Sequence, residues 1–357
     1  MISILVSVIV IIPTLLGWGK ITEKITGSLF HGVSGILFSG ILGLSTLWTI
    51  LAFWIPLNLS IEILTILAGI FYFIKDKQYY NLYNLLKTNK LLVLYTGLII
   101  LFCGTFYPFI LDHFGYYVPS IKWISEHGLV KGISNLDLIL GQMSVWHIFQ
   151  AGFSHLIDPF LRINTILLII YSLYIVEKRQ WIHLCFLPVM LLFAQSPSPD
   201  LPVFIFSLVI LNEILSGNTK TSILFAFSIF VFIIKPTMIW LPLVSFLYSV
   251  FIIKSPPKGY LLGFGLLLLF FLKNFWVFGY PIFPVAIGSF DFNWQPNPEI
   301  LKTSSEYAIR KTYDMQYSYE QIKNFSQLDY IKNWLFLKGI KSKMNILLIV
   351  SLLGFII

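Results

Sequence analysis

The sequence predicts an all-α membrane protein that crosses the bilayer many times. Of its 357 residues, 57% are hydrophobic and only 11% are charged, with a mean hydropathy of +0.83. Soluble domains are about one-quarter charged, so this composition excludes an ordinary soluble enzyme and a disordered chain. The net charge of +8 is spread over loops without a basic patch, which argues against nucleic-acid binding.

Eleven apolar runs predict about ten or eleven transmembrane helices. They cover residues 2–19, 33–54, 56–74, 91–110, 162–176, 181–195, 201–215, 221–234, 236–253, 259–272 and 344–357. Several of the later runs hold only 14 or 15 residues. A lone span needs about 20 residues, but a bundle or local thinning of the bilayer accommodates a shorter helix.

The lysines and arginines predict the orientation, because positively charged short loops stay in the cytoplasm. Starting from an extracytoplasmic N-terminus, eleven cations between Lys20 and Lys258 fall on one side. Only four fall on the other side before the last long loop. We therefore expect an integral protein of a bacterial inner or plasma membrane, with the side of eleven cations in the cytoplasm.

This topology divides the chain into five regions. They are an N-terminal four-helix membrane region (1–110), a first outer loop with surface helices (111–161), a membrane helix bundle (162–272), a long outer loop (273–343) and a last membrane helix (344–357).

Acidic residues gather on the predicted outer side, which holds eleven of the sixteen. Asp112 stands out because it directly follows the apolar run 91–110, where burial of a charge is costly. An interfacial anchor or a helix cap explains this carboxylate as well as a catalytic role does. The residues after it predict a helix along the membrane surface. One face of that helix carries Tyr116, Ser120, Trp123 and His127, and another carries Tyr117, Ile121 and Ile124.

The segment 136–159 fits a re-entrant or surface hairpin better than a full span, because a full span would invert every later loop. Four of the six histidines lie in this outer region, namely His113, His127, His147 and His155. Imidazole is a good metal ligand, but no pair shows HxxH or HExxH spacing. A histidine metal site therefore stays an alternative without a motif.

Three further outer elements carry candidate residues. Asp200 opens a helix after the Ser-Pro-Ser-Pro turn, where a helix cap is one explanation and a functional role another. Arg162 and Lys235 lie at outer helix ends, where cations either snorkel or bind a phosphate. The segment 273–284 closes the last long apolar region with a series of aromatic residues typical of a membrane interface.

Together these elements resemble the GT-C superfamily of integral-membrane glycosyltransferases. Asp112, followed by Tyr116, Tyr117 and Lys122-Trp123, is similar to the first outer loop of that family. Ser198-Pro-Asp200-Leu-Pro202 is similar to its Asp-Leu-Pro turn. Lys273-Asn274 through Pro284 resembles the Arg-Asn…Gly-Asn-Pro…Pro element of bacterial members. The three motifs occur in the same order, over residues 100–285.

The resemblance implies an inverting transfer of a hexosyl or pentosyl group from a polyprenyl-phosphate donor to a cell-surface glycan, lipid or protein on the extracytoplasmic face. Asp112 would be the general base. The substrate-binding residues implied are His113, Tyr116, Tyr117, Lys122, Trp123, Arg162, Asp200, Lys273 and Asn274. No cofactor is specified. Many relatives carry Asp-Glu where this chain carries Asp112-His113, so a divalent-metal requirement stays open.

Two other functions remain alternatives. A polysaccharide polymerase or ligase would use residues of the late outer loop 279–333, with Arg310 among them, and would leave Asp112 dispensable. A lipid-linked glycan transporter or flippase would place ionisable residues at the membrane midplane. The span centres carry almost no charge, and the exceptions, Glu62 and Glu213, lie near span ends. This distribution favours chemistry at the membrane surface.

Overall fold

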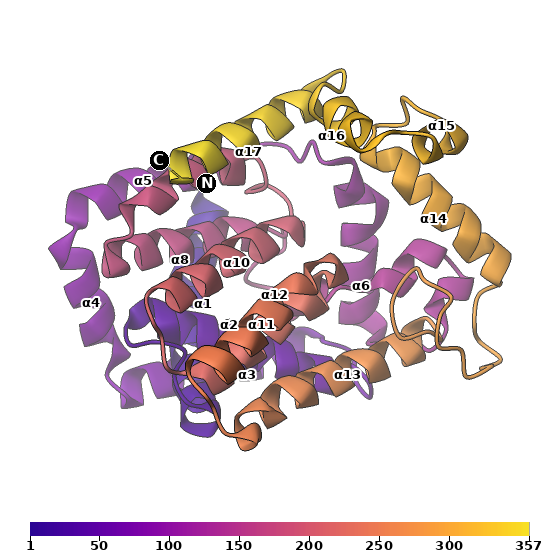
Figure 1. Cartoon of the computed structure of the whole chain (residues 1–357). Coiled ribbons are helices and arrows are strands. Elements are labelled where there is room, and N and C mark those ends of the chain that lie inside the picture. Colours follow the sequence, from indigo (N-terminus) through magenta and orange to yellow (C-terminus); the bar gives the residue numbers. More distant parts are fainter. Residues whose placement is uncertain (357) are drawn as a thin grey trace.

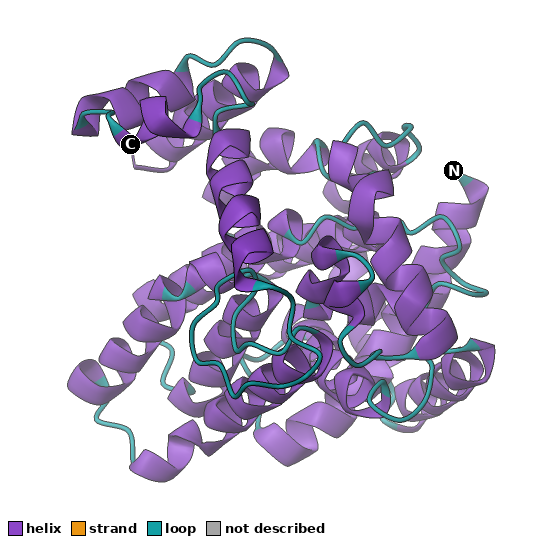
Figure 2. Cartoon of the chain, turned by 90° about the vertical axis from the view of Figure 1, so that its right-hand side faces the viewer, coloured by secondary structure: helices purple, strands orange, loops and turns teal. Residues whose placement is uncertain are grey.

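The computed structural model describes residues 1–356, with side chains to residue 354, and this part of the chain is built from helices joined by loops (Figure 2). The N-terminal region consists of α1 (Ile2–Thr26), α2 (Val33–Leu51), α3 (Leu59–Lys75), α4 (Gln78–Thr88) and α5 (Lys90–Gly104). The first outer loop holds the π-helix η1 (His113–Tyr117), α6 (Val118–His127), the 3-10 helices η2 (Ile133–Asn135) and η3 (Leu138–Gln142), and α7 (Val145–Ala151).

The second half begins with α8 (Ile163–Lys178), η4 (Trp181–Phe186), α9 (Leu187–Leu191), α10 (Asp200–Leu215) and α11 (Thr221–Ile234). It continues with η5 (Pro236–Met238), α12 (Trp240–Leu247), η6 (Tyr248–Ile252), η7 (Pro257–Tyr260) and α13 (Leu261–Val277). The last helices are α14 (Pro298–Thr312), α15 (Tyr319–Lys323), α16 (Gln327–Leu335) and α17 (Ile340–Ile356). The all-α prediction is confirmed for the described residues.

Each predicted apolar run forms helix, but few of these helices are long. Within the described residues, three helices are long and apolar enough to cross a membrane: Ile2–Thr26, Val33–Leu51 and Pro257–Val277. The pair α4 and α5, bent by 96° at its break, counts as a fourth if it forms one span. By helix length, the described residues therefore support three or four spans, fewer than the ten or eleven transmembrane helices expected, several of which were expected to be short. Prolines explain part of the difference, since Pro188 and Pro236 each begin a short helix after or within an apolar run.

Helices α1, α2 and α3 pack closely through glycines. A Cβ atom added at Gly17 would lie 1.8 Å from the carbonyl oxygen of Gly69, and one at Gly40 would lie 2.2 Å from that of Leu15. Small residues let backbones approach in this way without the hydrophobic drive available in water. Behind them, α8 and α11 are buried on almost every face, as expected of helices that are apolar all round.

The long helices connect two ends of the molecule. Helices α8 and α10 begin beside each other at one end, where Asn164 donates to the carbonyl oxygen of Ser198 at 2.9 Å. They finish together at the other end, where Lys178 and Glu213 form an ion pair of 3.3 Å. Lys178 also lies over the ring of Phe30, in the loop between α1 and α2. The loops that the sequence assigned to one membrane side thus gather at one end.

The late outer segment forms a small lobe of its own along one edge, in orange to yellow (Figure 1). Its apolar core contains Tyr313, Ile322 and Leu337. Helix α17 runs from this lobe back to η4 and α9. It begins at Ile340, before the apolar run predicted for 344–357, and residue 357 lies outside the described part.

Candidate functional site

Asp112 lies where the chain leaves α5 and enters the first outer loop. It is the residue before η1, a π-helix that continues directly into α6. The side chain is about one-third exposed, at 29%. Tyr117, Ile121 and Ile124 are buried against the core, and this anchors the segment that holds Asp112.

The late outer lobe supplies the partner of Asp112. The ammonium group of Lys311, in the last turn of α14, donates to Oδ1 of Asp112 at 2.6 Å. The side chain of Lys311 is 40% exposed, so the pair is reached by solvent. Exposed ion pairs stabilise a fold by about 0–1 kcal/mol, so fold stability alone does not require this lysine.

The Ser-Pro-Ser-Pro turn lies directly against the first outer loop. Nδ1 of His113 is 3.0 Å from Oγ of Ser196. The hydroxyl of Tyr117 donates to Oγ of Ser198 at 3.4 Å, and that hydroxyl in turn donates to Oδ2 of Asp200 at 3.0 Å. A chain of polar contacts thus joins the two segments that the sequence singled out separately.

Asp200 also has a cationic partner. Lys235, at the end of α11, forms a close ion pair with Oδ1 of Asp200. The side chains of both residues remain partly exposed. The two candidate carboxylates therefore each face one lysine, and both lysines come from other parts of the chain.

Tyr116 and Tyr117 lie near enough to both carboxylates to feel their charges. Burial raises the pKa of Tyr116 far above its ordinary value, and the charges of Tyr117, Asp112 and Asp200 raise it further. Burial raises the pKa of Tyr117 as well, with the charge of Asp200 adding to the effect. Both phenols are protonated at neutral pH and act as hydrogen-bond donors in the site.

A cavity of about 510 Å³ opens beside this cluster. Its polar lining includes His113, Lys122 and Arg162. Its aromatic lining includes Tyr107 and Phe114, whose rings are stacked with centroids 5.7 Å apart. Charged groups beside aromatic faces are typical of a pocket for a polar ligand with apolar surfaces.

Buried polar groups support the wall of this cavity. Arg162 donates to the backbone carbonyl of Gln195. Asp158 is buried and accepts from Nε2 of Gln150 at 3.0 Å. Burial raises the pKa of Asp158 to about 7, against the lowering effect of the backbone amide of Arg162. Burial and the charge of Arg162 lower the pKa of His113 to about 4, so its imidazole is neutral at pH 7.

Three predicted substrate-binding residues contact other groups of the protein. Lys273 is buried and donates to the carbonyl oxygen of Met143 at 2.7 Å. Asn274 donates to the carbonyl oxygen of Pro281 at 2.6 Å and holds the turn after α13. The ring of Trp123 packs against His127, with centroids 4.8 Å apart. Lys273 and Asn274 are buried, whereas Trp123 is partly exposed.

The four outer histidines do not converge on one point. His113 contacts Ser196, and His155 lies 3.2 Å from the carbonyl oxygen of Leu57. His147 is buried in α7 with its ring against Tyr117 at 5.0 Å. Within the described residues, no three His, Cys, Asp or Glu side chains are grouped as metal ligands would be.

Sequence reasoning missed several residues of the cluster. It did not single out Lys311, and it gave Ser196, Ser198 and Asp158 no role. A basic last turn in the amphipathic segment 298–312 was the available signal for Lys311. Nothing in the local pattern indicated that this turn would reach Asp112.

The whole chain, residues 1–357, matches a family described as Domain of unknown function (DUF8201), and it belongs to that family. No curated protein and no solved structure matches it.

Proposed function

We propose that this member of the DUF8201 family is a membrane glycosyltransferase. It moves a sugar from a polyprenyl-phosphate donor to a cell-surface acceptor, a glycan, lipid or protein, on the extracytoplasmic face. One observation carries the proposal. The charges of Asp112 and Asp200, from distant segments, both act on the buried Tyr116–Tyr117 pair, and each carboxylate is paired with a lysine. Carboxylates beside partly exposed cations suit a reaction that removes a proton and releases a phosphate.

Asp112 acts as the general base in this mechanism. Its carboxylate removes the proton from the acceptor hydroxyl, and the resulting oxygen attacks the anomeric carbon. The bond between that carbon and the phosphate oxygen breaks, so the configuration inverts and the electron pair leaves on the lipid phosphate. General base catalysis of this kind contributes about 10²–10⁴-fold.

The two lysines neutralise the leaving group. Lys311 and Lys235 are paired with carboxylates and remain partly exposed. A lipid phosphate in the site would compete for both ammonium groups, and release of Lys311 would free Asp112 to accept a proton. Asp200, held by Ser198 as well as Lys235, keeps the second lysine near the phosphate.

The cavity beside the cluster receives the acceptor. Lys122 and Arg162 offer hydrogen-bond donors, and the stacked rings of Tyr107 and Phe114 offer flat apolar surfaces. A sugar ring presents both hydroxyls and apolar faces, so it fits this lining. The prenyl chain of the donor stays in the bilayer while its headgroup reaches the site.

The test is complementation of a deletion strain, scored by the surface-glycan profile with expression checked. Asp112→Asn removes the base with little change in shape, so the glycan change should be lost. Asp137→Asn is the matched control, because Asp137 is exposed and caps η3 through Oδ1, which asparagine retains. Wild-type behaviour of Asp112→Asn would rule out the proposed base.

A polymerase or ligase is the second candidate, and one observation favours it. The late outer segment that would hold its catalytic residues reaches Asp112 through Lys311, the neighbour of Arg310. Arg310→Ala separates the two proposals. Loss of the glycan with Arg310→Ala and retention with Asp112→Asn would favour the polymerase.

A further inference from the structure

A second polar region lies at the end of the molecule away from Asp112. Ser7, near the start of α1, donates to the carbonyl oxygen of Ile157 in the first outer loop. Lys20 and Lys24 follow more than three turns later on the same helix, about 20–25 Å further along its axis. The region around these lysines is therefore separate from the candidate active site.

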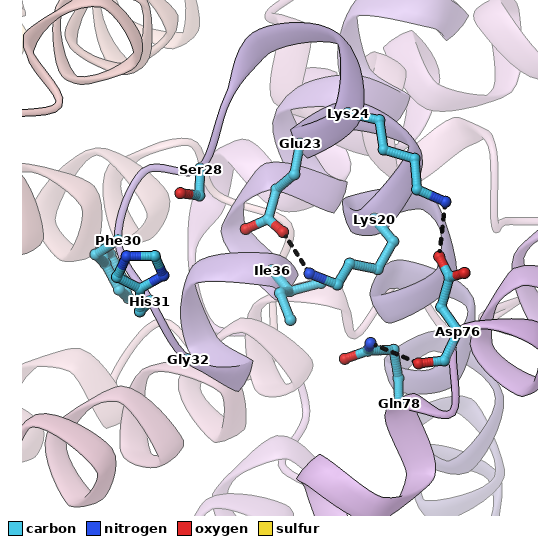
Figure 3. A pocket seen from close by; sticks show the side chains of 10 residues that line it. All are labelled: Lys20, Glu23, Lys24, Ser28, Phe30, His31, Gly32, Ile36, Asp76 and Gln78. Atoms are coloured by element: carbon cyan, nitrogen blue, oxygen red, sulfur yellow. Dashed lines mark hydrogen bonds and ion pairs between the residues drawn. The ribbon is translucent and has the colours of Figure 1, made fainter.

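A cavity of about 530 Å³ opens at this end of α1. Figure 3 shows Lys20, Glu23 and Lys24 on α1 facing Asp76, which follows α3, and Gln78, the first residue of α4, with His31 on the opposite wall. A second cavity of about 470 Å³ shares Lys20, Gly32 and Ile36 with it. Its other polar lining consists of Asn81, Asn84, Thr88 and Glu177. The two cavities share this wall, and together they make the polar space between α1 and α4.

The geometry of α4 places this space at the membrane surface. Helix α4 is bent by 96° from α5, so it lies along the surface when α5 runs across the bilayer. Its outer face exposes Tyr79, Tyr80 and Tyr83, by 41%, 57% and 60%. Tyrosines are enriched at the level of lipid headgroups. Gln78, on the other side of the helix, is buried against the cavity.

Lysines outnumber carboxylates among the residues that line the space or stand next to its lining in the sequence. Two lysines, Lys20 and Lys24, line it together with the three carboxylates Glu23, Asp76 and Glu177. Four more lysines stand within two residues of lining residues in the sequence, namely Lys75, Lys77, Lys87 and Lys90. Glu177 is already engaged, since it accepts from the backbone amides of Val33 and Ser34 at 2.6 and 2.9 Å. Lys20 and Lys24 pair with Glu23 and Asp76 at 2.8 and 3.0 Å. The remaining four lysines have no carboxylate partner among the described residues.

We infer that this space is a binding site for the phosphate-bearing headgroup of an anionic phospholipid. The headgroup enters beside the tyrosines of α4, and its phosphate takes the place of Glu23 on Lys20. Clusters of four to eight lysines or arginines beside a membrane helix attract anionic lipids. On the orientation that the cations predict, this is the cytoplasmic leaflet. The inference does not depend on glycosyl transfer.

The test uses the full-length protein purified in detergent and native mass spectrometry of bound lipid. Phosphatidylglycerol and phosphatidylethanolamine with the same acyl chains are offered at equal concentration. Wild type should retain phosphatidylglycerol preferentially. The double variant Lys20→Gln/Lys24→Gln should weaken that retention roughly tenfold.

Two further variants keep the result interpretable. Lys302→Gln/Lys323→Gln removes two exposed lysines of the outer lobe and should leave lipid retention unchanged. Glu23→Gln frees Lys20 from its ion pair and should increase retention, an effect opposite to that of misfolding. Equal retention of the two lipids by wild type would overturn the inference, as would equal losses from both lysine pairs. Displacement of phosphatidylglycerol by millimolar inorganic phosphate would show that the space binds a soluble anion, and it would overturn the inference of a lipid site.

Discussion

Glu62 is a buried carboxylate that holds the first outer loop to α3, and removing its charge tests this role. Its side chain has no exposed surface. Oε2 accepts from the backbone amides of His155 and Leu156 at 2.9 and 3.0 Å, and Oε1 accepts from that of Ile157 at 2.8 Å. Glu62→Gln keeps the shape but replaces one oxygen by an amide group that donates.

The expected loss follows from these three hydrogen bonds. Glutamine can keep the two contacts to one oxygen, but its NH₂ group then faces the N–H of Ile157. One hydrogen bond to a charged group contributes about 1.5–3 kcal/mol, and leaving a donor buried without a partner costs about 1–3 kcal/mol. We therefore expect Glu62→Gln to lower the free energy of unfolding by about 2.5–6 kcal/mol.

Two assays measure the effect. Thermal unfolding of the purified protein in detergent should show a lowered midpoint. Hydrogen exchange of the amides of residues 155–157 should become faster, because these amides lose their charged acceptor. Glu299→Gln, at an exposed position in the first turn of α14, is the control. An unchanged midpoint with unchanged exchange at 155–157 would refute the reasoning.

Three other perturbations give distinct outcomes. Gly32→Ala should destabilise by about 1–3 kcal/mol, since φ is +130° and the new Cβ would lie 2.5 Å from the carboxyl of Glu177; an unchanged unfolding midpoint would contradict this. Asp158 has a raised pKa of about 7, so between about pH 4 and pH 7 the folded state binds more protons than the unfolded state, and the stability that this contributes is lost as the pH rises through 7. Asp158→Asn should therefore raise the free energy of unfolding more at pH 8 than at pH 5. An equal change in the free energy of unfolding at both pH values would exclude this titration. Lys311→Met should change the unfolding free energy by less than about 1 kcal/mol yet abolish complementation; retained complementation would show that the ion pair with Asp112 has no role in function.

Local sequence patterns predicted the helices well because helix formation depends on near neighbours. The runs 162–176, 201–215 and 221–234 each became a helix with nearly the predicted bounds. Spacing also predicted the helix after Asp112, and its buried face is the one that carries Tyr117, Ile121 and Ile124. Fewer helices of the described residues are long enough to span a membrane than the number of apolar runs predicted, because hydropathy does not register where prolines and 3-10 turns interrupt an apolar run.

The candidate site was predictable only in part. Sequence reasoning chose Asp112 and Asp200 as separate acidic positions at helix ends, and a shared location for them was implied by resemblance alone. Their lysine partners, Lys311 and Lys235, were not assigned to them. Ion pairs between distant segments leave no periodic signal in the sequence, so pairing becomes visible only when the helices are packed. Glycosyl transfer itself stays a prediction.

By itself, the sequence determined that the chain is helical, apolar and rich in lysine on one set of loops. Those properties follow from side-chain hydrophobicity and local backbone preference, which each segment carries independently of the others. The tertiary structure decided which polar groups meet: Lys311 with Asp112, Lys235 with Asp200, and Glu62 with the amides of 155–157. These contacts depend on how closely the glycine-lined helices approach and where the late lobe folds back, and both are properties of the packed chain as a whole.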